Sequence, residues 1–359
     1  MAEENQSDSR TRRSSGTQLD RREQLPWTLD GLKILSIDGG GIRGILPAAV
    51  LTLCEQRFTG GRPAGEYFDY IAGTSTGGII ALGLASGMPA SAILKLYMDH
   101  GAAIFPPPAQ LDWLISKSVR KAWRFVRGLL HYRYDREELA RQLAAVFQDR
   151  VIGDADRRLV IPSFDEFNEV TLFKTPHHQA YKLDWSLGMV AVALSTSAAP
   201  TFFSTYKNGD RQFADGGVWA NNPIMTALVD AMACYAIDRH QIDILSLGCV
   251  ESEFAFTKGQ IAKGGVWHWR EIISAAMRLQ SQNALGQAGL LVGRDRLLRV
   301  DGAPMKSNPI DLDDYTRSAA ELPAIAASLV KQHEERLAAL FAAPRPPYKA
   351  VYGPRSQDA

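Results

Sequence analysis

The sequence predicts an α/β fold in which a mostly parallel central sheet is covered by helices on both faces. Three observations support this prediction. The chain has 359 residues and is 46% apolar, which is enough to bury a sizeable core. Short apolar runs typical of buried strands alternate with longer runs of helical periodicity. Two of the strand candidates end in glycine-rich turns that lead directly into a helix. This alternation indicates βαβ units, whose helices cover both faces of a parallel sheet.

The predicted elements follow one another in a simple order. A strand over 32–37 leads through a glycine-rich turn into a helix over 45–58, and a strand over 67–72 leads through a second such turn into an apolar helix over 79–85. The further strand candidates are Arg158–Ser163, Val170–Lys174 and Ile242–Leu247. The further helix candidates are Glu137–Phe147, Leu187–Thr196, Pro223–Ile237 and Val266–Leu291.

The amino-acid composition argues against several classes of protein and site. Lys and Arg number 40 and Asp and Glu number 39, so the formal charge of +1 argues against a protein that captures DNA or RNA by bulk charge. The three cysteines are widely spaced and form no C-x-x-C pair, which argues against a disulfide framework or a structural zinc site. We also find no cluster of acidic or histidine residues with ligand spacing, and we expect neither a metal nor another cofactor.

Three regions are distinguished by composition. Residues 1–25 are polar and are expected to form a disordered tail, residues 26–343 to form one domain, and residues 344–359 to form a flexible, Pro-rich tail. No apolar run reaches the ~18 residues that span a bilayer, and the N-terminal segment lacks the apolar core of a signal peptide. We therefore expect a cytoplasmic protein that is not integral to a membrane.

The second glycine-rich turn carries a nucleophile candidate. Gly73-Thr-Ser-Thr-Gly77 is a G-x-S-x-G sequence placed between a strand and a helix, which is the context that this motif requires. The flanking glycines allow a sharp turn, which lifts Ser75 above the sheet edge at a helix N-terminus. The alternative is a glycine-rich turn with an incidental serine.

The first glycine-rich turn, Gly39-Gly-Gly-Ile-Arg-Gly44, admits two functions. It fits the G-x-G-x-x-G pattern of dinucleotide-binding loops, but Gly60-Gly61-Arg62 occupies the place ~20 residues on where such a site usually has an acidic residue. Consecutive glycines also allow backbone amides to approach an oxyanion closely. A plain tight turn is the remaining alternative.

A serine nucleophile needs a base, and the histidines supply no clear candidate. The pair His177-His178 lies between extended segments, where paired histidines are more often surface residues. Asp215 is followed by two glycines that would let it approach another loop closely, and in a dry site beside Ser75 a carboxylate could accept the hydroxyl proton. Read alone, Asp-Gly-Gly is usually just a turn.

Together the three motifs resemble the patatin-like phospholipase family. The sequences D-G-G-G-I-R-G, G-T-S-T-G-G and D-G-G followed by N-N-P occur in this order, and the resemblance covers roughly 32–247 and, more weakly, 295–301. It implies a three-layer α/β/α fold and a phospholipase with a Ser-Asp dyad of Ser75 and Asp215. It further implies an active-site cleft along Ala193–Phe203, including Ser197 and Pro200. The oxyanion hole that it implies comprises Gly39, Gly40, Gly41, Arg43, Gly44 and Thr76.

Within this family the chain resembles the bacterial effectors of anti-phage systems that a cyclic dinucleotide activates. This resemblance implies membrane phospholipids as substrate, the inner-membrane surface as the place of action and a cyclic dinucleotide such as cyclic GMP-AMP as allosteric activator, and it leaves a homodimer open. An unregulated lipid acyl hydrolase or thioesterase is the nearest alternative. An inactive nucleotide-binding module is the alternative of another class, against which the intact Ser75 and Asp215 argue.

Residues 111–134 form an unusual basic segment. At 100° per residue its apolar side chains share one face and its basic side chains lie on the other, at Lys117, Arg120, Lys121, Arg124 and Arg127. We expect such a helix to form a lid over the active site or to contact an anionic membrane surface. A helix packed on the core with a solvated basic face, or a contact with nucleotide phosphates, would explain the pattern equally.

Overall fold

The protein is described here by a computed structural model, which covers residues 21–106, 134–200, 202–250, 272–303 and 309–356. Its main sheet has eight strands in the order β10-β9-β2-β3-β4-β7-β6, with β5 paired to β4. The strands are β2 (Leu32–Ile37), β3 (Tyr70–Gly73), β4 (Arg158–Asp165), β5 (Val170–Lys174), β6 (Tyr206–Asn208), β7 (Arg211–Asp215), β9 (Ile242–Leu247) and β10 (Leu297–Val300). The predicted α/β fold with a mostly parallel sheet is confirmed.

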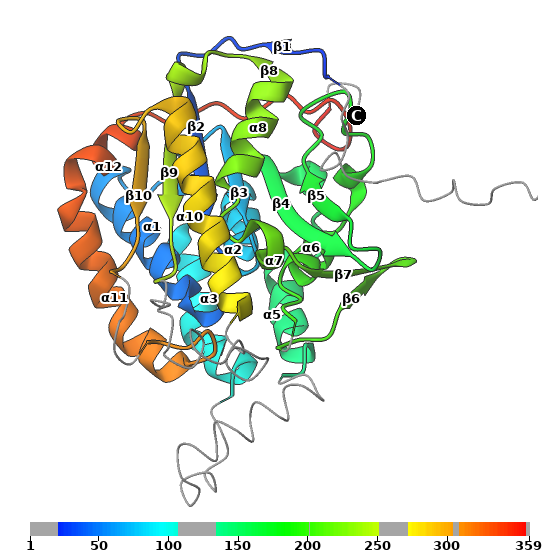
Figure 1. Cartoon of the computed structure of the whole chain (residues 1–359), viewed down its shortest axis with the longest axis vertical. Helices are drawn as coiled ribbons and strands as arrows, with labels where there is room; N and C mark the ends of the chain where they lie inside the picture. Colours follow the sequence, from blue (N-terminus) through cyan, green and yellow to red (C-terminus); the bar gives the residue numbers. More distant parts are fainter. Residues whose placement is uncertain (1–20, 107–133, 201, 251–271, 304–308, 357–359) are drawn as a thin grey trace, which may run out of the picture.

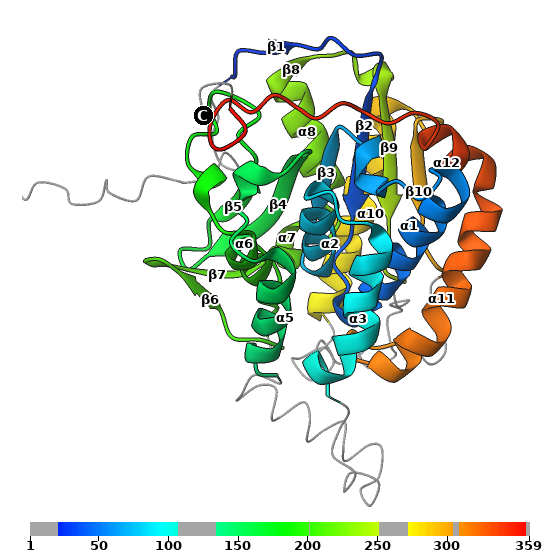
Figure 2. The same cartoon turned by 180° about the vertical axis from the view of Figure 1, so that it is seen from behind.

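The helices form a layer on each face of this sheet. The first layer consists of α1 (Ile45–Phe58), α2 (Thr76–Ala85), α3 (Ala90–Ile104) and α11 (Tyr315–Gln332), seen in front of the sheet in Figure 2. The second consists of α8 (Ile224–Cys234) and α10 (Ile272–Val292), seen in front in Figure 1. The remaining helices are α5 (Glu137–Phe147), α6 (Met189–Thr196), α7 (Gly217–Ala220) and α12 (Glu334–Leu340).

Alternation along β2 divides the core between these layers. Leu35 and Ile37 point into the apolar cluster beneath α1, α2 and α11, whereas Leu32 and Ile34 point into the cluster beneath α8 and α10. Side chains of a strand alternate between the faces of a sheet, so a strand buried on both faces must be apolar at nearly every position. This requirement explains why four of the six residues of β2, all except Lys33 and Ser36, are apolar.

Strand direction places two loops next to each other. Strands β10, β9, β2, β3 and β4 are parallel, but β7 is antiparallel to β4. Ala72 of β3 pairs with Val160 of β4, and Asp215 of β7 pairs with Ser163 of β4. The turn that follows β3 therefore lies level with the end of β7, with only β4 between them.

Most predicted elements are found with shifted ends. The second strand begins at Tyr70 because Ala64–Tyr67 forms a 3₁₀ turn instead. The helix predicted from Val266 is observed as α10, and residues before Ile272 lie outside the described residues. Several elements were not predicted from the sequence: α3, α11, α12, β6, β7 and β10.

The C-terminal segment differs from the prediction. Residues 344–356 were expected to form a flexible tail, but they lie against the domain (Figure 2). The Arg345 side chain donates to both carboxylate oxygens of the buried Asp69, at 3.1 and 3.0 Å, and Tyr348 is buried. The amide of Val351 donates to the carbonyl of Pro176. The composition of this segment suggests too few contacts to compensate for the entropy lost on ordering. The long-range contacts seen here provide that compensation.

Two other predicted segments lie largely outside the described residues. Within the predicted tail 1–25, the structure describes residues 21–25, and Leu25–Pro26 forms a short strand, β1, paired with β8 (Tyr235–Ala236). The basic segment 111–134 is described only at Tyr134, so its proposed membrane contact stays a prediction. Among the described residues, we find no helix with the length and apolarity needed to cross a bilayer.

Candidate active site

Ser75 occupies a strained turn between β3 and α2. Its backbone has φ 56° and ψ −122°, a conformation that non-glycine residues rarely adopt and that is typical of a nucleophile elbow. The turn requires glycine on either side, because a Cβ atom added at Gly73 would lie 2.0 Å from the Gly77 carbonyl oxygen, and one added at Gly77 would lie 2.3 Å from the Ile37 carbonyl oxygen. The predicted elbow of Gly73, Ser75 and Gly77 therefore has the expected shape.

Thr196, the last residue of α6, holds this turn in place. Its Oγ1 accepts a hydrogen bond from the Ser75 amide at 3.0 Å and donates to the Pro162 carbonyl of β4 at 2.6 Å. Thr196 lies in the segment Ala193–Phe203 that the resemblance placed along the active site, but sequence reasoning did not single it out. Ser197, which was named there, instead donates its hydroxyl to the Ala193 carbonyl of its own helix.

Asp215, the last residue of β7, lies beside Ser75. Its amide donates to the Ala198 carbonyl at 3.0 Å, and its Oδ1 accepts from the Gly217 amide at 2.7 Å. Burial raises the pKa of this carboxyl to about 6, although hydrogen bonds from the Ser75 side chain and the Gly217 amide oppose the rise. A carboxylate with such a pKa, placed beside a serine hydroxyl, can accept the serine proton near neutral pH.

The glycine loop after β2 presents unpaired amides at the same edge of the sheet. Within the described residues, the amides of Gly40 and Gly41 donate to no acceptor, and neither does the amide of Thr76, the first residue of α2. Free amides at a tight loop and a helix N-terminus can stabilise a developing negative charge. These three amides are the candidate donors of an oxyanion hole.

The other predicted members of the oxyanion hole are engaged elsewhere. The Gly39 amide donates to the Asn221 carbonyl at 3.0 Å, and the Arg43 amide donates to the Gly40 carbonyl at 3.2 Å. The Arg43 guanidinium donates to the Val250 carbonyl at 2.7 Å. Gly44 lies close to Thr76, since a Cβ atom added there would lie 2.3 Å from the Thr76 Oγ1. Gly39, Arg43 and Gly44 thus shape the loop, whereas Gly40 and Gly41 offer its free donors.

An ion-pair network holds the start of this loop in place. It was not predicted from the sequence. Arg299 of β10 donates to both carboxylate oxygens of Asp38, at 3.0 and 2.7 Å, and also to Asp301 at 2.8 Å. Asp38 is buried and directly precedes the three glycines. The bidentate geometry fixes the start of the loop in position and orientation. The weak resemblance over 295–301 was the only signal in the sequence.

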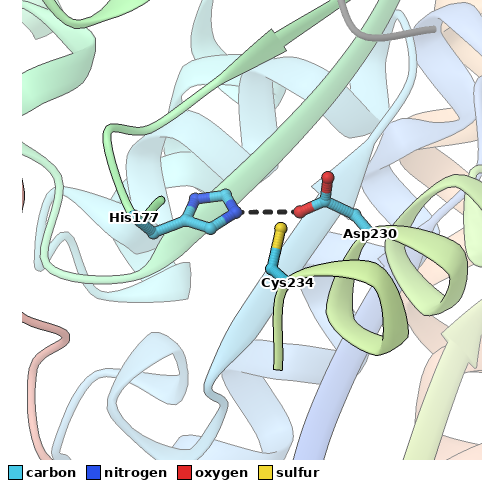
Figure 3. Close-up of side chains that lie close together, drawn as sticks. All are labelled: His177, Asp230 and Cys234. Atoms are coloured by element: carbon cyan, nitrogen blue, oxygen red, sulfur yellow. Dashed lines mark hydrogen bonds and ion pairs between the residues drawn. The ribbon is translucent and has the colours of Figure 1, made fainter. Parts of the chain in front are cut away.

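A second polar cluster lies at the opposite edge of the sheet, and it corrects the expectation that His177 and His178 are surface residues. Both are buried, because they follow β5 at the end that pairs with the beginning of β4. As Figure 3 shows, the His177 ring faces Asp230 of α8, and its Nε2 lies 2.8 Å from Asp230 Oδ2. Burial lowers the pKa of His177 to about 4, so the ring is neutral near pH 7. No histidine of this cluster can serve Ser75.

This cluster offers metal-binding atoms but fits a metal poorly. Ligand atoms of His177, Asp230 and Cys234 lie within 4.8 Å of one another. However, Lys174 Nζ lies 2.7 Å from Asp230 Oδ1, and the Tyr181 hydroxyl donates to the same oxygen. Burial alone would raise the pKa of Asp230, but Lys174 and His177 lower it well below its usual range. The lysine thus already supplies the positive charge that the carboxylate needs.

Comparisons with known proteins identify the family of the chain. The family model for patatin-like phospholipases matches residues 35–228, a range that includes Ser75, Asp215 and the glycine loop. The chain is 33% identical over 245 residues to a cGAMP-activated phospholipase of Vibrio cholerae serotype O1, covering 64% of this chain and 68% of that protein. It is 32% identical over 262 residues to a cGAMP-activated phospholipase of Pseudomonas aeruginosa, covering 71% and 74%.

A plant relative matches the same part of the chain. Patatin-like protein 2 of Oryza sativa subsp. indica is 33% identical over 272 residues, covering 66% of this chain and 65% of that protein. Because the family model spans more than half of the 359 residues, and because the two bacterial phospholipases match over two thirds or more of their length, the family is established. The chain therefore belongs to the patatin-like phospholipase family and is a hydrolase of that family.

Proposed function

We propose that the protein hydrolyses acyl esters of membrane phospholipids through an acyl-enzyme on Ser75, with Asp215 as the base. The observation that carries this proposal is the position of the buried Asp215 carboxyl at the end of β7, beside a strained G-x-S-x-G elbow whose Ser75 side chain lowers the pKa of that carboxyl. Family membership supports the reaction class. His177 and His178, the histidine pair considered as a base, are buried at the opposite edge of the sheet.

The first half-reaction transfers the acyl group to the enzyme. The Ser75 oxygen attacks the ester carbon as Asp215 takes the hydroxyl proton, and the carbonyl oxygen acquires negative charge. The amides of Gly40, Gly41 and Thr76, which donate to no acceptor within the described residues, are the proposed donors to that oxygen. When the tetrahedral intermediate collapses, the bond to the alcohol breaks, and Asp215 returns the proton to the departing lysolipid oxygen.

The second half-reaction restores the enzyme. Asp215 accepts a proton from water as the water oxygen attacks the acyl carbon. The Ser75 oxygen leaves with that proton, and the fatty acid is released. Asp215 has then returned its proton and is again an ionised carboxylate, so the same carboxylate serves both halves.

The raised pKa of Asp215 gives a pH prediction. The base must be ionised, so kcat/KM should fall about tenfold per pH unit below pH 6 and reach a plateau above about pH 7. Because the folded-state pKa lies above the unfolded value, this carboxyl stabilises the fold only at low pH, and that contribution is lost as the pH rises through 6.

The Asp215→Asn variant should therefore be inactive yet more stable than the wild type at pH 8, by about 2 kcal/mol, with the gain vanishing below about pH 4. Urea unfolding at both pH values measures the difference. A variant that is less stable than the wild type at pH 8 would contradict the burial of an ionised Asp215.

We further propose that a cyclic dinucleotide, with 3',3'-cyclic GMP-AMP as the first candidate, activates the enzyme. Three bacterial relatives are named cGAMP-activated phospholipases, which supports this regulation. A phospholipase inside the cell would also face its host's membrane at all times and needs restraint. A ligand that shifts an inactive:active ratio from 99:1 to 1:99 must prefer the active state by roughly 5.5 kcal/mol.

Purified protein on liposomes tests both proposals at once, with lipids read by mass spectrometry across a panel of cyclic dinucleotides. We expect little hydrolysis without nucleotide and at least about 50-fold more with the activating one. Full activity without any nucleotide would reject the proposed activation and indicate a constitutive lipid acyl hydrolase. Nucleotide binding without hydrolysis of any ester would indicate an inactive binding module.

A further inference from the structure

The side chain of Asn221 has an unused acceptor beside the proposed dyad. Asn221 follows α7 and is 7% exposed. Its Nδ2 donates to Ser281 Oγ of α10 at 3.3 Å, and its backbone carbonyl accepts from the Gly39 amide. Its Oδ1 is buried and accepts no hydrogen bond from the described residues. Buried side-chain oxygens almost always have a donor, so this one calls for an explanation.

The oxygen lies between the glycine loop and the dyad. A Cβ atom added at Gly39 would lie 2.6 Å from Asn221 Oδ1 and 3.3 Å from the Ser75 Cβ. One added at Gly217 would lie 3.3 Å from Asn221 Oδ1 and 3.0 Å from Asp215 Oδ1. The carboxamide oxygen thus lies against Gly39 and Gly217, the two glycines that also face Ser75 and Asp215.

The water molecule that hydrolyses the acyl-enzyme must bind at this place, and it has two hydrogen atoms to donate. We propose that Asn221 Oδ1 orients the hydrolytic water, which donates one hydrogen bond to Asn221 and the other to Asp215. This assignment rests on the proposed Ser75–Asp215 dyad. Buried waters are typically held by such otherwise unpaired polar atoms, and orienting a reactant is a large part of catalysis.

The role is confined to the second half-reaction. Asp215 takes the proton that points at it, and the water oxygen forms a bond to the acyl carbon. The bond from that carbon to the Ser75 oxygen breaks, and the same proton passes to that oxygen. The second water hydrogen stays on the product acid and remains bonded to Asn221 until release. Acylation by the lipid needs no water, so it does not use this contact.

Two measurements on Asn221→Leu separate the half-reactions. Leucine has a similar volume and no acceptor, and the backbone contact with Gly39 is kept. With a p-nitrophenyl ester, the rate of the initial burst should change less than threefold, whereas the steady-state rate should fall about 10- to 100-fold. In the second measurement, methanol is added and competes with water for the acyl-enzyme. Methanol has a single hydrogen to donate, so it cannot donate to both Asp215 and Asn221. The ratio of methyl ester to free acid should therefore rise about tenfold in the variant.

Asn222 is a matched control. It is also buried, but its Oδ1 accepts from Ser36 Oγ at 3.0 Å and from the Ile224 amide at 3.0 Å. Asn222→Leu should lose stability and keep the wild-type product ratio. If Asn221→Leu does not fold, Asn221→Ala should show the same shift in the ratio. The two variants thus separate the loss of the acceptor from the loss of a buried asparagine.

Other outcomes would overturn the assignment. An unchanged product ratio in both Asn221 variants would reject it, and so would an equal slowing of the burst and the steady state. Neither result would bear on the assignment of Ser75 and Asp215 as the catalytic dyad. Loss of the dyad assignment would appear separately, as a burst that persists in Ser75→Ala.

Discussion

Replacing Ser75 with alanine is expected to lower phospholipid hydrolysis by at least about 10⁴-fold, because the acyl-enzyme cannot form without the hydroxyl. Asp215→Ala should have a similar effect, since it removes the base that both half-reactions use. The double variant should be no worse than either single one, because residues that act as a unit are not additive. Liposome hydrolysis with quantified fatty acid release provides the measurement.

The fold should survive both changes, which thermal unfolding of each variant can verify. Replacement of His177 supplies a useful contrast, because this ring lies at the opposite edge of the sheet and is neutral. If Asp215→Ala retained near-normal rates while loss of a histidine silenced a folded enzyme, the dyad assignment would be wrong.

Gly40→Ala is expected to lower kcat about 10²- to 10³-fold, the usual loss when an oxyanion donor is misplaced. A Cβ atom at this position would lie 2.3 Å from the Cβ of Cys249 and 2.7 Å from its Sγ, so the loop must move. The amide of Gly40, which donates to no acceptor within the described residues, would move with it. Ester hydrolysis kinetics measure the loss, and KM should change little.

Two further variants show whether the clash is the cause. Gly286→Ala in α10 is the control, because a Cβ atom added there meets nothing within 4 Å, and it should leave kcat unchanged. Combining Gly40→Ala with Cys249→Gly removes the atoms in conflict, and about tenfold or more of the lost rate should return. If Gly40→Ala kept the wild-type kcat, the assignment of the Gly40 amide to the oxyanion hole would be wrong.

The sequence was sufficient to predict the parts of the site that depend on local geometry. The elbow at Ser75 needs glycine on both sides and a strand before it, and each of these requirements is visible within a few residues. Asp215 is followed by two glycines in the same manner. The placement of Ser75 beside Asp215 came from the resemblance, because it depends on β7 pairing antiparallel to β4.

Features that depend on distant contacts could not be predicted in this way. His177 and Asp230 are 53 positions apart, so nothing near the histidine pair indicates that it is buried. Arg299 contacts Asp38 across 261 positions, and the loop that it supports gives no local sign of the ion pair. The C-terminal segment has the composition of a flexible tail, yet Arg345 finds its carboxylate at Asp69, 276 positions away.

The proposed acyl-enzyme can be observed directly. The protein, with a cyclic dinucleotide present, would be mixed with a defined phospholipid, quenched in acid within the first turnover and analysed by intact and peptide mass spectrometry. We expect a mass increase of one fatty acyl group on the peptide that contains Ser75, and none in Ser75→Ala. Lipid hydrolysis without any adduct, or an adduct that persists at another residue in Ser75→Ala, would contradict a mechanism through Ser75.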